Sequence, residues 1–182
     1  MINIQTVAAP IVIAKFPEHE LFQQDVLAAI DSMPDHSICE GDDQITKTDY
    51  WEAGPEKRPD IGRPYWDIIA PYMKDLIRTI SKQIDLDHFQ WGEYGQAWYQ
   101  QYYQTDAHSW HRHPLSVYNV VYYLELPPDA PPTLLRNPLD TTQHLEPPVK
   151  EGDIIVFPSF IKHCSPPSRS TERKTIIAFN LT

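Results

Sequence analysis

The chain has 182 residues, of which 41% are hydrophobic and 12% aromatic, so it can bury a sizeable core as one globular domain. It carries 15 Lys and Arg residues against 25 Asp and Glu residues, and the resulting formal charge of −10 disfavours binding to nucleic acid or to an anionic membrane surface. No apolar run reaches the length of a transmembrane helix, and Cys39 and Cys164 form no CxxC pair, so we expect a soluble protein of a reducing, cytoplasmic compartment.

The first half of the chain predicts two helices. Residues 2–15 alternate enough to form one or two strands, and apolar residues then recur at helical spacing over 18–33. Residues 35–64 show no clear period and contain several glycines and prolines, which predicts a loop-rich segment. A second amphipathic helix is predicted at about 66–84, with Pro71 best placed in its first turn, where the missing N–H costs little. If the helix starts earlier, Pro71 lies inside it and kinks it.

The second half predicts β-structure. Residues 89–103 are aromatic and rich in Gln, which favours strands. Further strand candidates, separated by prolines, are 117–126, 133–136, 152–157 and 174–181. Helices first and short strands later indicate an α+β protein with a jelly-roll (double-stranded β-helix, cupin-like) core and two N-terminal helices packed on one sheet. We expect a single domain over 1–182, with helical support in 1–88 and the jelly-roll core in 89–182.

Two histidines two residues apart, His111 and His113, begin the part of the chain that carries the chemistry. In a strand, side chains at i and i+2 point to one face, and their Cα atoms are about 7 Å apart. Such a pair is often an ordinary feature of a strand, but it can also converge on one divalent transition metal. A metal site of this kind needs a third ligand. The best candidate is His163, which follows a predicted strand ending at Pro158 and Ser159.

A cation on the last predicted strand points to an anionic ligand. Arg173 and Thr175 share a strand face with the apolar residues Ile177 and Phe179. If the apolar pair faces inward, Arg173 does too, and an inward cation is costly unless a carboxylate meets it. The nearby sequence offers no obvious acidic partner, so we predict that a bound dicarboxylate pairs with Arg173.

The strand after the histidine pair offers matching polar groups. Asn119 and Tyr123 share one face of this strand. A Tyr123 hydroxyl beside Arg173 and Thr175 would complete a seat for a carboxylate. Tyr102, nine residues before His111, is a further candidate for the same pocket.

Taken together, these motifs resemble the iron(II)- and 2-oxoglutarate-dependent dioxygenases, and among them a group of oxygenases found in bacteria and marine phages. The shared pattern is, in chain order, HxHPxS at 111–116, VYYL at 121–124, EGD at 151–153, FPS at 157–159, His163, Arg173 and AFN at 178–180. The match covers about residues 95–182, and the order and spacing of five separate motifs argue against chance.

The resemblance implies a jelly-roll oxygenase that uses Fe(II), 2-oxoglutarate and O2 to hydroxylate an unidentified substrate, with loss of carbon dioxide from 2-oxoglutarate to give succinate. It implies that His111 and His163 are iron ligands. It also implies that Arg173, with Thr175 and Tyr123, binds the distal carboxylate of 2-oxoglutarate.

One position departs from the usual pattern of two histidines and one carboxylate. His113 occupies the place of that carboxylate, so the expected metal ligands are His111, His113 and His163, with Asp106 as an alternative third ligand. Two other functions stay open. A three-histidine, cupin-type dioxygenase without a keto acid would explain His113 but would leave Arg173 and Tyr123 without a partner. A non-catalytic jelly-roll binding protein would not explain why His111, His163 and Arg173 are all present.

Overall fold

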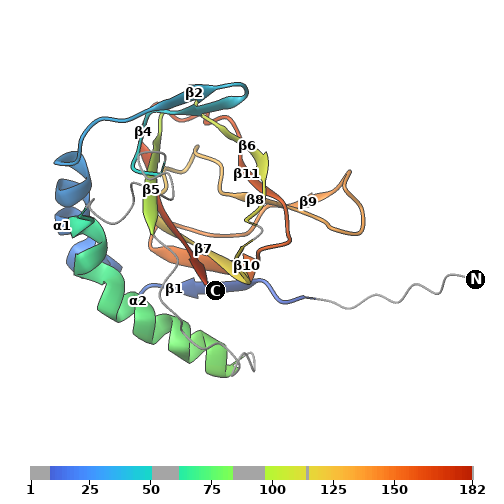
Figure 1. The fold of residues 1–182 in the computed structure, drawn as a ribbon, viewed down its shortest axis with the longest axis horizontal. Helices are drawn as coiled ribbons and strands as arrows, with labels where there is room; N and C mark the ends of the chain where they lie inside the picture. Colours follow the sequence, from blue (N-terminus) through green and yellow to red (C-terminus); the bar gives the residue numbers. More distant parts are fainter. Residues whose placement is uncertain (1–8, 51–61, 84–96, 114, 182) are drawn as a thin grey trace, which may run out of the picture.

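A computed structural model describes residues 9–50, 62–83, 97–113 and 115–181 (Figure 1). The two helices are α1 (His19–Asp31) and α2 (Pro64–Gln83). The strands are β1 (Val12–Lys15), β2 (Ile38–Glu40), β3 (Asp43–Ile45), β4 (Lys47–Thr48), β5 (Trp98–Tyr102), β6 (His108–His111), β7 (Tyr118–Glu125), β8 (Leu134–Arg136), β9 (His144–Leu145), β10 (Asp153–Pro158), β11 (His163–Ser165) and β12 (Lys174–Leu181).

The strands form two main antiparallel sheets that face each other. The larger sheet has the order β1-β10-β7-β12-β5-β4, and the smaller one has the order β6-β11-β8-β9. A short hairpin of β2 and β3 forms a third, two-stranded sheet. Neighbours in each sheet come from distant parts of the sequence, as in a jelly roll: β10 pairs with β7, and β12 lies between β7 and β5. The expected jelly-roll core is therefore confirmed.

The larger sheet is buried on both faces. On one face, residues such as Tyr99, Tyr122 and Phe179 pack with the apolar sides of α1 and α2. Figure 1 shows both helices on this side, away from the smaller sheet. On the other face, residues such as Tyr123 and Ile176 form a second apolar cluster toward the smaller sheet. Residues of both parities on β7 and β12 are therefore buried, and this double burial decides where the functional side chains point.

The helices agree with the predicted ones except at the start of α2. This helix begins at Pro64, so Pro71 lies in its interior rather than in its first turn. The ring at Pro71 removes one helical hydrogen bond, while Pro64 occupies the first position, where no bond is lost. Neither described helix is long and apolar enough to cross a membrane. The expected boundary between a helical part and a jelly-roll part, at 88–89, lies outside the described residues.

The EGD motif has a structural role at the corner before β10. Gly152 has a φ of 85°, and a Cβ added there would come within 3.0 Å of the His19 ring. Nδ1 of His19 is 2.7 Å from the hydroxyl of Tyr122, which points to the helix side of the sheet. Glycine at 152 thus allows α1 to lie against the sheet.

Candidate active site

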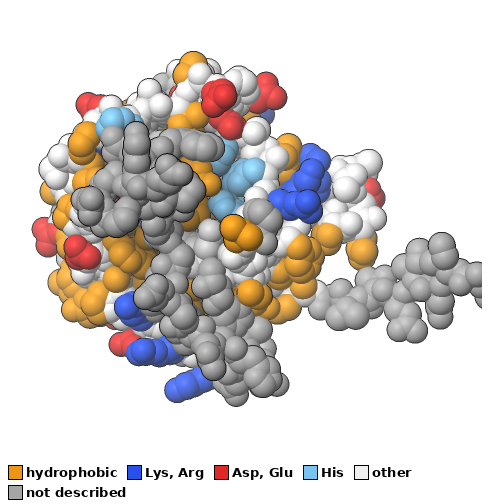
Figure 2. Space-filling view, viewed as in Figure 1, with side chains coloured by type: hydrophobic (Ala, Val, Ile, Leu, Met, Phe, Trp, Pro, Cys, Tyr) orange, Lys and Arg blue, Asp and Glu red, His pale blue; other side chains and the backbone are white. Residues whose placement is uncertain are grey.

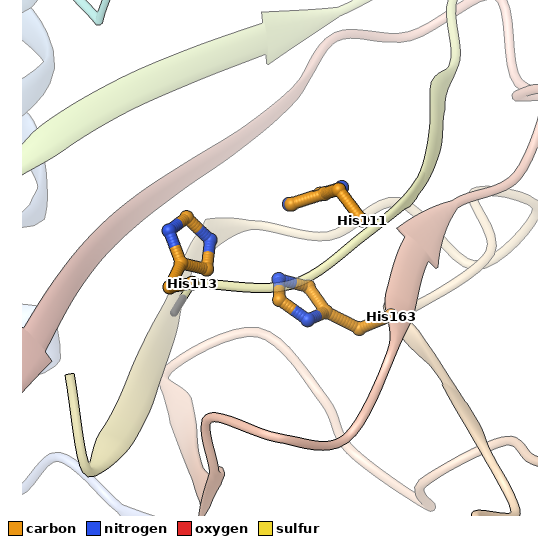
Figure 3. Close-up of side chains that lie close together, drawn as sticks. All are labelled: His111, His113 and His163. Carbon is orange, nitrogen blue, oxygen red and sulfur yellow. The ribbon is translucent and has the colours of Figure 1, made fainter. Parts of the chain in front are cut away.

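Three histidines from two segments of the chain meet between the two sheets. His111 ends β6, His113 follows it by two residues, and His163 begins β11 directly opposite His111 in the strand register. One ligand nitrogen from each ring lies within 4.8 Å of those of the other two. Figure 3 shows the three rings turned toward a common point. The sequence predicted these three histidines as ligands of one metal ion, and the fold does bring the three rings together.

The protonation and tautomers of these rings suit a metal. Burial lowers the pKa of each of the three, and that of His113 falls to about 4, so the rings are neutral at pH 7. Nδ1 of His111 is 2.7 Å from the carbonyl oxygen of Ser109, and Nδ1 of His163 is 3.3 Å from that of Ile161. A neutral ring that donates from Nδ1 keeps its Nε2 lone pair for a metal. The donor set therefore fits a divalent transition metal.

Asp106, the alternative third ligand, points elsewhere. Its Oδ2 accepts hydrogen bonds from the Thr46 hydroxyl at 2.5 Å and from the backbone N–H of Tyr103 at 2.9 Å. Among the described residues, the group that could hold a metal contains His113 and not Asp106. The geometry thus favours His113 of the two candidates.

The histidines line a narrow cavity together with two of the five residues predicted to bind the cofactor. Asn119 and Tyr102 line its wall together with His111, His113 and His163. The cavity volume is about 20 Å³, roughly the space of one water molecule. A larger ligand therefore requires wall side chains to move. Figure 2 shows histidine side chains at the surface near the middle of the viewed face, over β6 and β11.

Aromatic and polar groups fix the orientation of the rings. The His108 ring stacks on His111 with 3.9 Å between centroids, and the Trp98 ring lies 5.4 Å from that of His113. Gln100 links His108, at 3.3 Å, to the hydroxyl of Tyr102, which donates to it at 2.9 Å. The stacking of His108 on His111 was not predicted from the sequence, because the spacing of His108 does not distinguish it from an ordinary loop histidine.

Tyr123 lies just behind the cavity wall. It is fully buried, and its hydroxyl accepts the backbone N–H of Thr133 at 3.2 Å. Thr133 itself lines the cavity. Tyr123 therefore supports the wall from the pocket side of β7. The predicted seat with Arg173 and Thr175 is not formed, because those two side chains pair with Glu125 on the helix side of the sheet.

Arg173 does not reach the cavity, and the premise that it lacks an acidic partner is wrong. Its Nε and Nη2 donate to Glu125 at 2.7 and 3.0 Å, and its Nη1 donates to Asp31 at 2.8 Å. Thr175 also donates to Glu125. The predicted shared face with Phe179 is correct, but that face packs against the helices. Because both faces of the sheet are apolar, an apolar neighbour did not identify the pocket side.

The cation on the pocket side is Lys174, which the sequence analysis missed. It is 1% exposed and lies between residues of the pocket-side cluster. Its Nζ donates to the carbonyl oxygen of Pro131 at 2.7 Å and to the hydroxyl of Ser165 at 2.9 Å, and it lies 5.0 Å from the centre of the Tyr102 ring. Burial lowers its pKa to about 7. None of its hydrogen-bond partners in the described part of the chain is a carboxylate.

Comparison with known proteins agrees on the fold. An oxidoreductase of the 2OG-Fe(II) oxygenase family from Burkholderia pseudomallei matches 93% of this chain and 84% of its own, with a TM-score of 0.70 at 13% identity. A Pseudomonas putida prolyl-4-hydroxylase matches with a TM-score of 0.62 at 15% identity, over 95% of this chain and 92% of its own. A viral collagen prolyl hydroxylase of Paramecium Bursaria Chlorella virus-1, solved with 2-oxoglutarate (2OG), matches with a TM-score of 0.55 at 12% identity over 93% of each chain.

The chain has the fold of the 2OG-Fe(II) oxygenases. No family model and no curated protein sequence matches it. At these identities the likeness establishes the architecture, while the chemistry has to be argued from the residues of this site.

Proposed function

We propose that the protein is an Fe(II)- and 2-oxoglutarate-dependent oxygenase that hydroxylates its substrate. The observation that carries this proposal is the pairing of a three-histidine cluster with a fully buried lysine, both on the inside of one jelly roll. The fold, shared with oxygenases of this kind, is independent support.

In this proposal, His111, His113 and His163 hold the iron. When bound, the iron would supply the activation of O2, of which one oxygen atom oxidises 2-oxoglutarate to succinate and carbon dioxide and the other hydroxylates the substrate. The protein's own part is to present three neutral nitrogens and to exclude water from between the sheets. His111 and His163 are held in the right tautomer by their backbone hydrogen bonds.

Lys174, in place of Arg173, then binds the distal carboxylate of 2-oxoglutarate. In the strand register, Trp98, which lies against the His113 ring, is opposite Ala178. Lys174 is four positions earlier on the same strand and face, about 13 Å along β12. The extended lysine side chain and a five-carbon dicarboxylate can together span that distance. Pairing with an anion would also compensate the buried charge.

A three-histidine dioxygenase without a keto acid is the second candidate, and the presence of His113 in the cluster favours it. It would leave the buried ammonium of Lys174 without a charge partner. The oxygenase that uses 2-oxoglutarate explains both features.

The deciding experiment is anaerobic titration of Fe(II), followed by 2-oxoglutarate, monitored by absorption spectroscopy. We expect a weak metal-to-ligand charge-transfer band that appears only when both are present. His111→Ala and His163→Ala should abolish it by removing an iron ligand. Iron binding without any binding of 2-oxoglutarate would instead support the three-histidine dioxygenase, and no iron binding would refute both enzymes.

A further inference from the structure

A pair of asparagines lies at the end of the cavity away from Lys174. We propose that Asn119 and Asn180 recognise the substrate by binding an amide group, a role that rests on the proposed function and names the chemistry of its substrate. The group recognised is one that presents a hydrogen-bond acceptor and an N–H donor side by side.

Along β12, the two asparagines lie on the far side of the three histidines from Lys174. Asn119 and Asn180 are directly opposite each other on β7 and β12, and both line the cavity. Asn180 is two positions past Ala178, whereas Lys174 is four positions before it. A ligand group that reaches Asn180 therefore lies on the other side of the histidines from the proposed 2-oxoglutarate carboxylate.

The Asn119 amide is held in one orientation by two serines. Its Oδ1 accepts from the Ser159 hydroxyl at 2.8 Å and lies 3.3 Å from that of Ser116, and the two serine oxygens are 2.9 Å apart. These contacts direct Nδ2 away from the serines. They also give a role to the serines of the HxHPxS and FPS motifs, which the iron chemistry alone does not explain.

Each asparagine has a buried polar atom without a hydrogen-bond partner among the described residues. Nδ2 of Asn119 and Oδ1 of Asn180 are buried and make no hydrogen bond to any residue that the structure describes. Asn119 as a whole is 3% exposed. A buried donor or acceptor left unpaired is costly, and such atoms are rare in folded proteins. Two of them, on residues that are paired across neighbouring strands and that line one cavity, indicate that a ligand completes their hydrogen bonds.

The unpaired atoms differ in kind, and this restricts the ligand to a group that both accepts and donates a hydrogen bond. Nδ2 of Asn119 is a donor and Oδ1 of Asn180 is an acceptor. A carboxylate would satisfy only the donor, and an ammonium only the acceptor. A hydroxyl group does both through a single oxygen, whereas an amide does so through two atoms at a fixed separation, which suits two asparagines on neighbouring strands. A lactam or primary carboxamide presents its C=O and N–H side by side, and so does one residue of an extended peptide, whose own C=O and N–H point to the same edge.

The test uses small probes with protein loaded with Zn(II), as a diamagnetic substitute for iron, and with 2-oxoglutarate. 2-Pyrrolidinone, N-methyl-2-pyrrolidinone and γ-butyrolactone have similar shapes, but only the first has both C=O and N–H. Binding is followed by the ¹H–¹⁵N signal of the Asn119 side-chain amide. We expect 2-pyrrolidinone to shift this signal and to bind about tenfold more tightly than the other two, as one lost hydrogen bond predicts.

Variants test whether the pair itself makes the distinction. Asn119→Leu and Asn180→Leu keep the side-chain size and should each remove the preference for the lactam, measured by calorimetric titration. Asn137→Leu is the matched control, because Asn137 caps the backbone of Leu139 outside this cavity, and it should keep the preference. Equal binding of lactam and lactone by the wild type, or an unchanged preference in both pair variants, would overturn the proposal.

Two further measurements distinguish a peptide substrate from a small amide, and distinguish failure of this proposal from failure of the proposed function. Tighter binding of N-acetylglycine N-methylamide than of 2-pyrrolidinone would support a peptide substrate, and the reverse would support a small lactam or carboxamide. Zinc and 2-oxoglutarate affinities are measured on the same samples. If zinc or 2-oxoglutarate fails to bind, the proposed function is wrong. The preference for the lactam can then be measured on the protein without zinc and 2-oxoglutarate, and it still decides the role of the asparagines.

Discussion

At the residue scale, two adjacent cations have opposite environments. Arg173 is satisfied by two carboxylates on the helix side of β12, whereas Lys174 is enclosed on the pocket side, where its partners among the described residues are neutral oxygens. A side chain that already has two carboxylate partners gains little from a further anion. An ammonium hydrogen-bonded to neutral oxygens gains more from one. These neighbours therefore make a matched pair for testing the 2-oxoglutarate site.

We expect Lys174→Met to weaken 2-oxoglutarate binding by about a hundredfold or more, because losing one partner of a buried charge pair costs about 3–5 kcal/mol. Arg173→Met should change the affinity by less than about threefold. The measurement is anaerobic titration of 2-oxoglutarate into the iron-loaded protein. A large loss in Arg173→Met with none in Lys174→Met would restore the assignment made from the sequence.

The third metal ligand can be tested at the same scale. His113→Ala should lower the affinity for Fe(II) by more than about a hundredfold, beyond the loss that follows removal of an outer-shell partner. His113→Asp supplies the more usual carboxylate and should retain iron binding. Competition with a coloured chelator measures both. Full affinity in His113→Ala would remove this histidine from the ligand set.

At the element scale, Arg173 joins three elements that are distant in sequence. Its partners are Glu125 at the end of β7, 48 residues earlier, and Asp31 at the end of α1, 142 residues earlier. The pairs are only about a fifth exposed at Arg173 and Glu125, so solvent screens them less than a surface pair. Arg173 therefore has a structural role in fastening α1 to the large sheet.

Removing this link should destabilise the fold without affecting the site. We expect Arg173→Met to lower the free energy of unfolding by about 2 kcal/mol, the typical value of hydrogen bonds to charged groups. Urea denaturation measures this. Arg78→Met is the control, because the Arg78–Asp75 pair is exposed and its loss should cost less than about 0.5 kcal/mol. Equal losses in the two variants would contradict the assigned role of Arg173.

At the scale of the whole molecule, the buried lysine makes stability depend on pH. The pKa of Lys174 is about 7 in the folded protein, against an ordinary value of 10.5. Between these values the unfolded chain binds more protons than the folded one, so the free energy of unfolding rises with pH across this window. Below pH 7 the lysine is charged in both states, and its burial is fully unfavourable.

This dependence predicts the behaviour of the protein without metal or 2-oxoglutarate. Lys174→Met should be more stable than the wild type at pH 7, and its advantage should shrink steadily toward pH 10. Thermal unfolding at several pH values measures the difference. Lys47→Met removes a buried lysine whose ammonium has a carboxylate partner, Asp35 at 2.9 Å, and should show no such trend. A constant difference between wild type and Lys174→Met would show that the lysine is not buried as a neutral amine.

The sequence by itself predicted the jelly-roll architecture and the cluster of three histidines. Short strands with alternating residues after two amphipathic helices predict a jelly roll, and the i, i+2 spacing of His111 and His113 predicts that they share a face. The two rings do converge, although β6 ends at His111 and His113 lies just beyond it. His163 is a candidate because it follows a predicted strand, and the fold pairs it with His111. Each of these inferences depends on local periodicity or on the order of motifs, which survive without knowledge of long-range contacts.

Only the tertiary structure decided which side chains of β12 enter the pocket. Alternation correctly grouped Arg173 with Thr175 and separated both from Lys174, but it did not say which group faces the pocket. Hydrophobicity identifies the inner face of a sheet only when the other face is exposed to solvent. Here the helices cover one face of the large sheet and the second sheet covers the other. The acidic partners of Arg173 and the unpaired atoms of the asparagines are likewise set by contacts between distant segments. The alternation of side chains along a strand determines which residues share a face, but only the packing of the whole fold determines which element lies against that face.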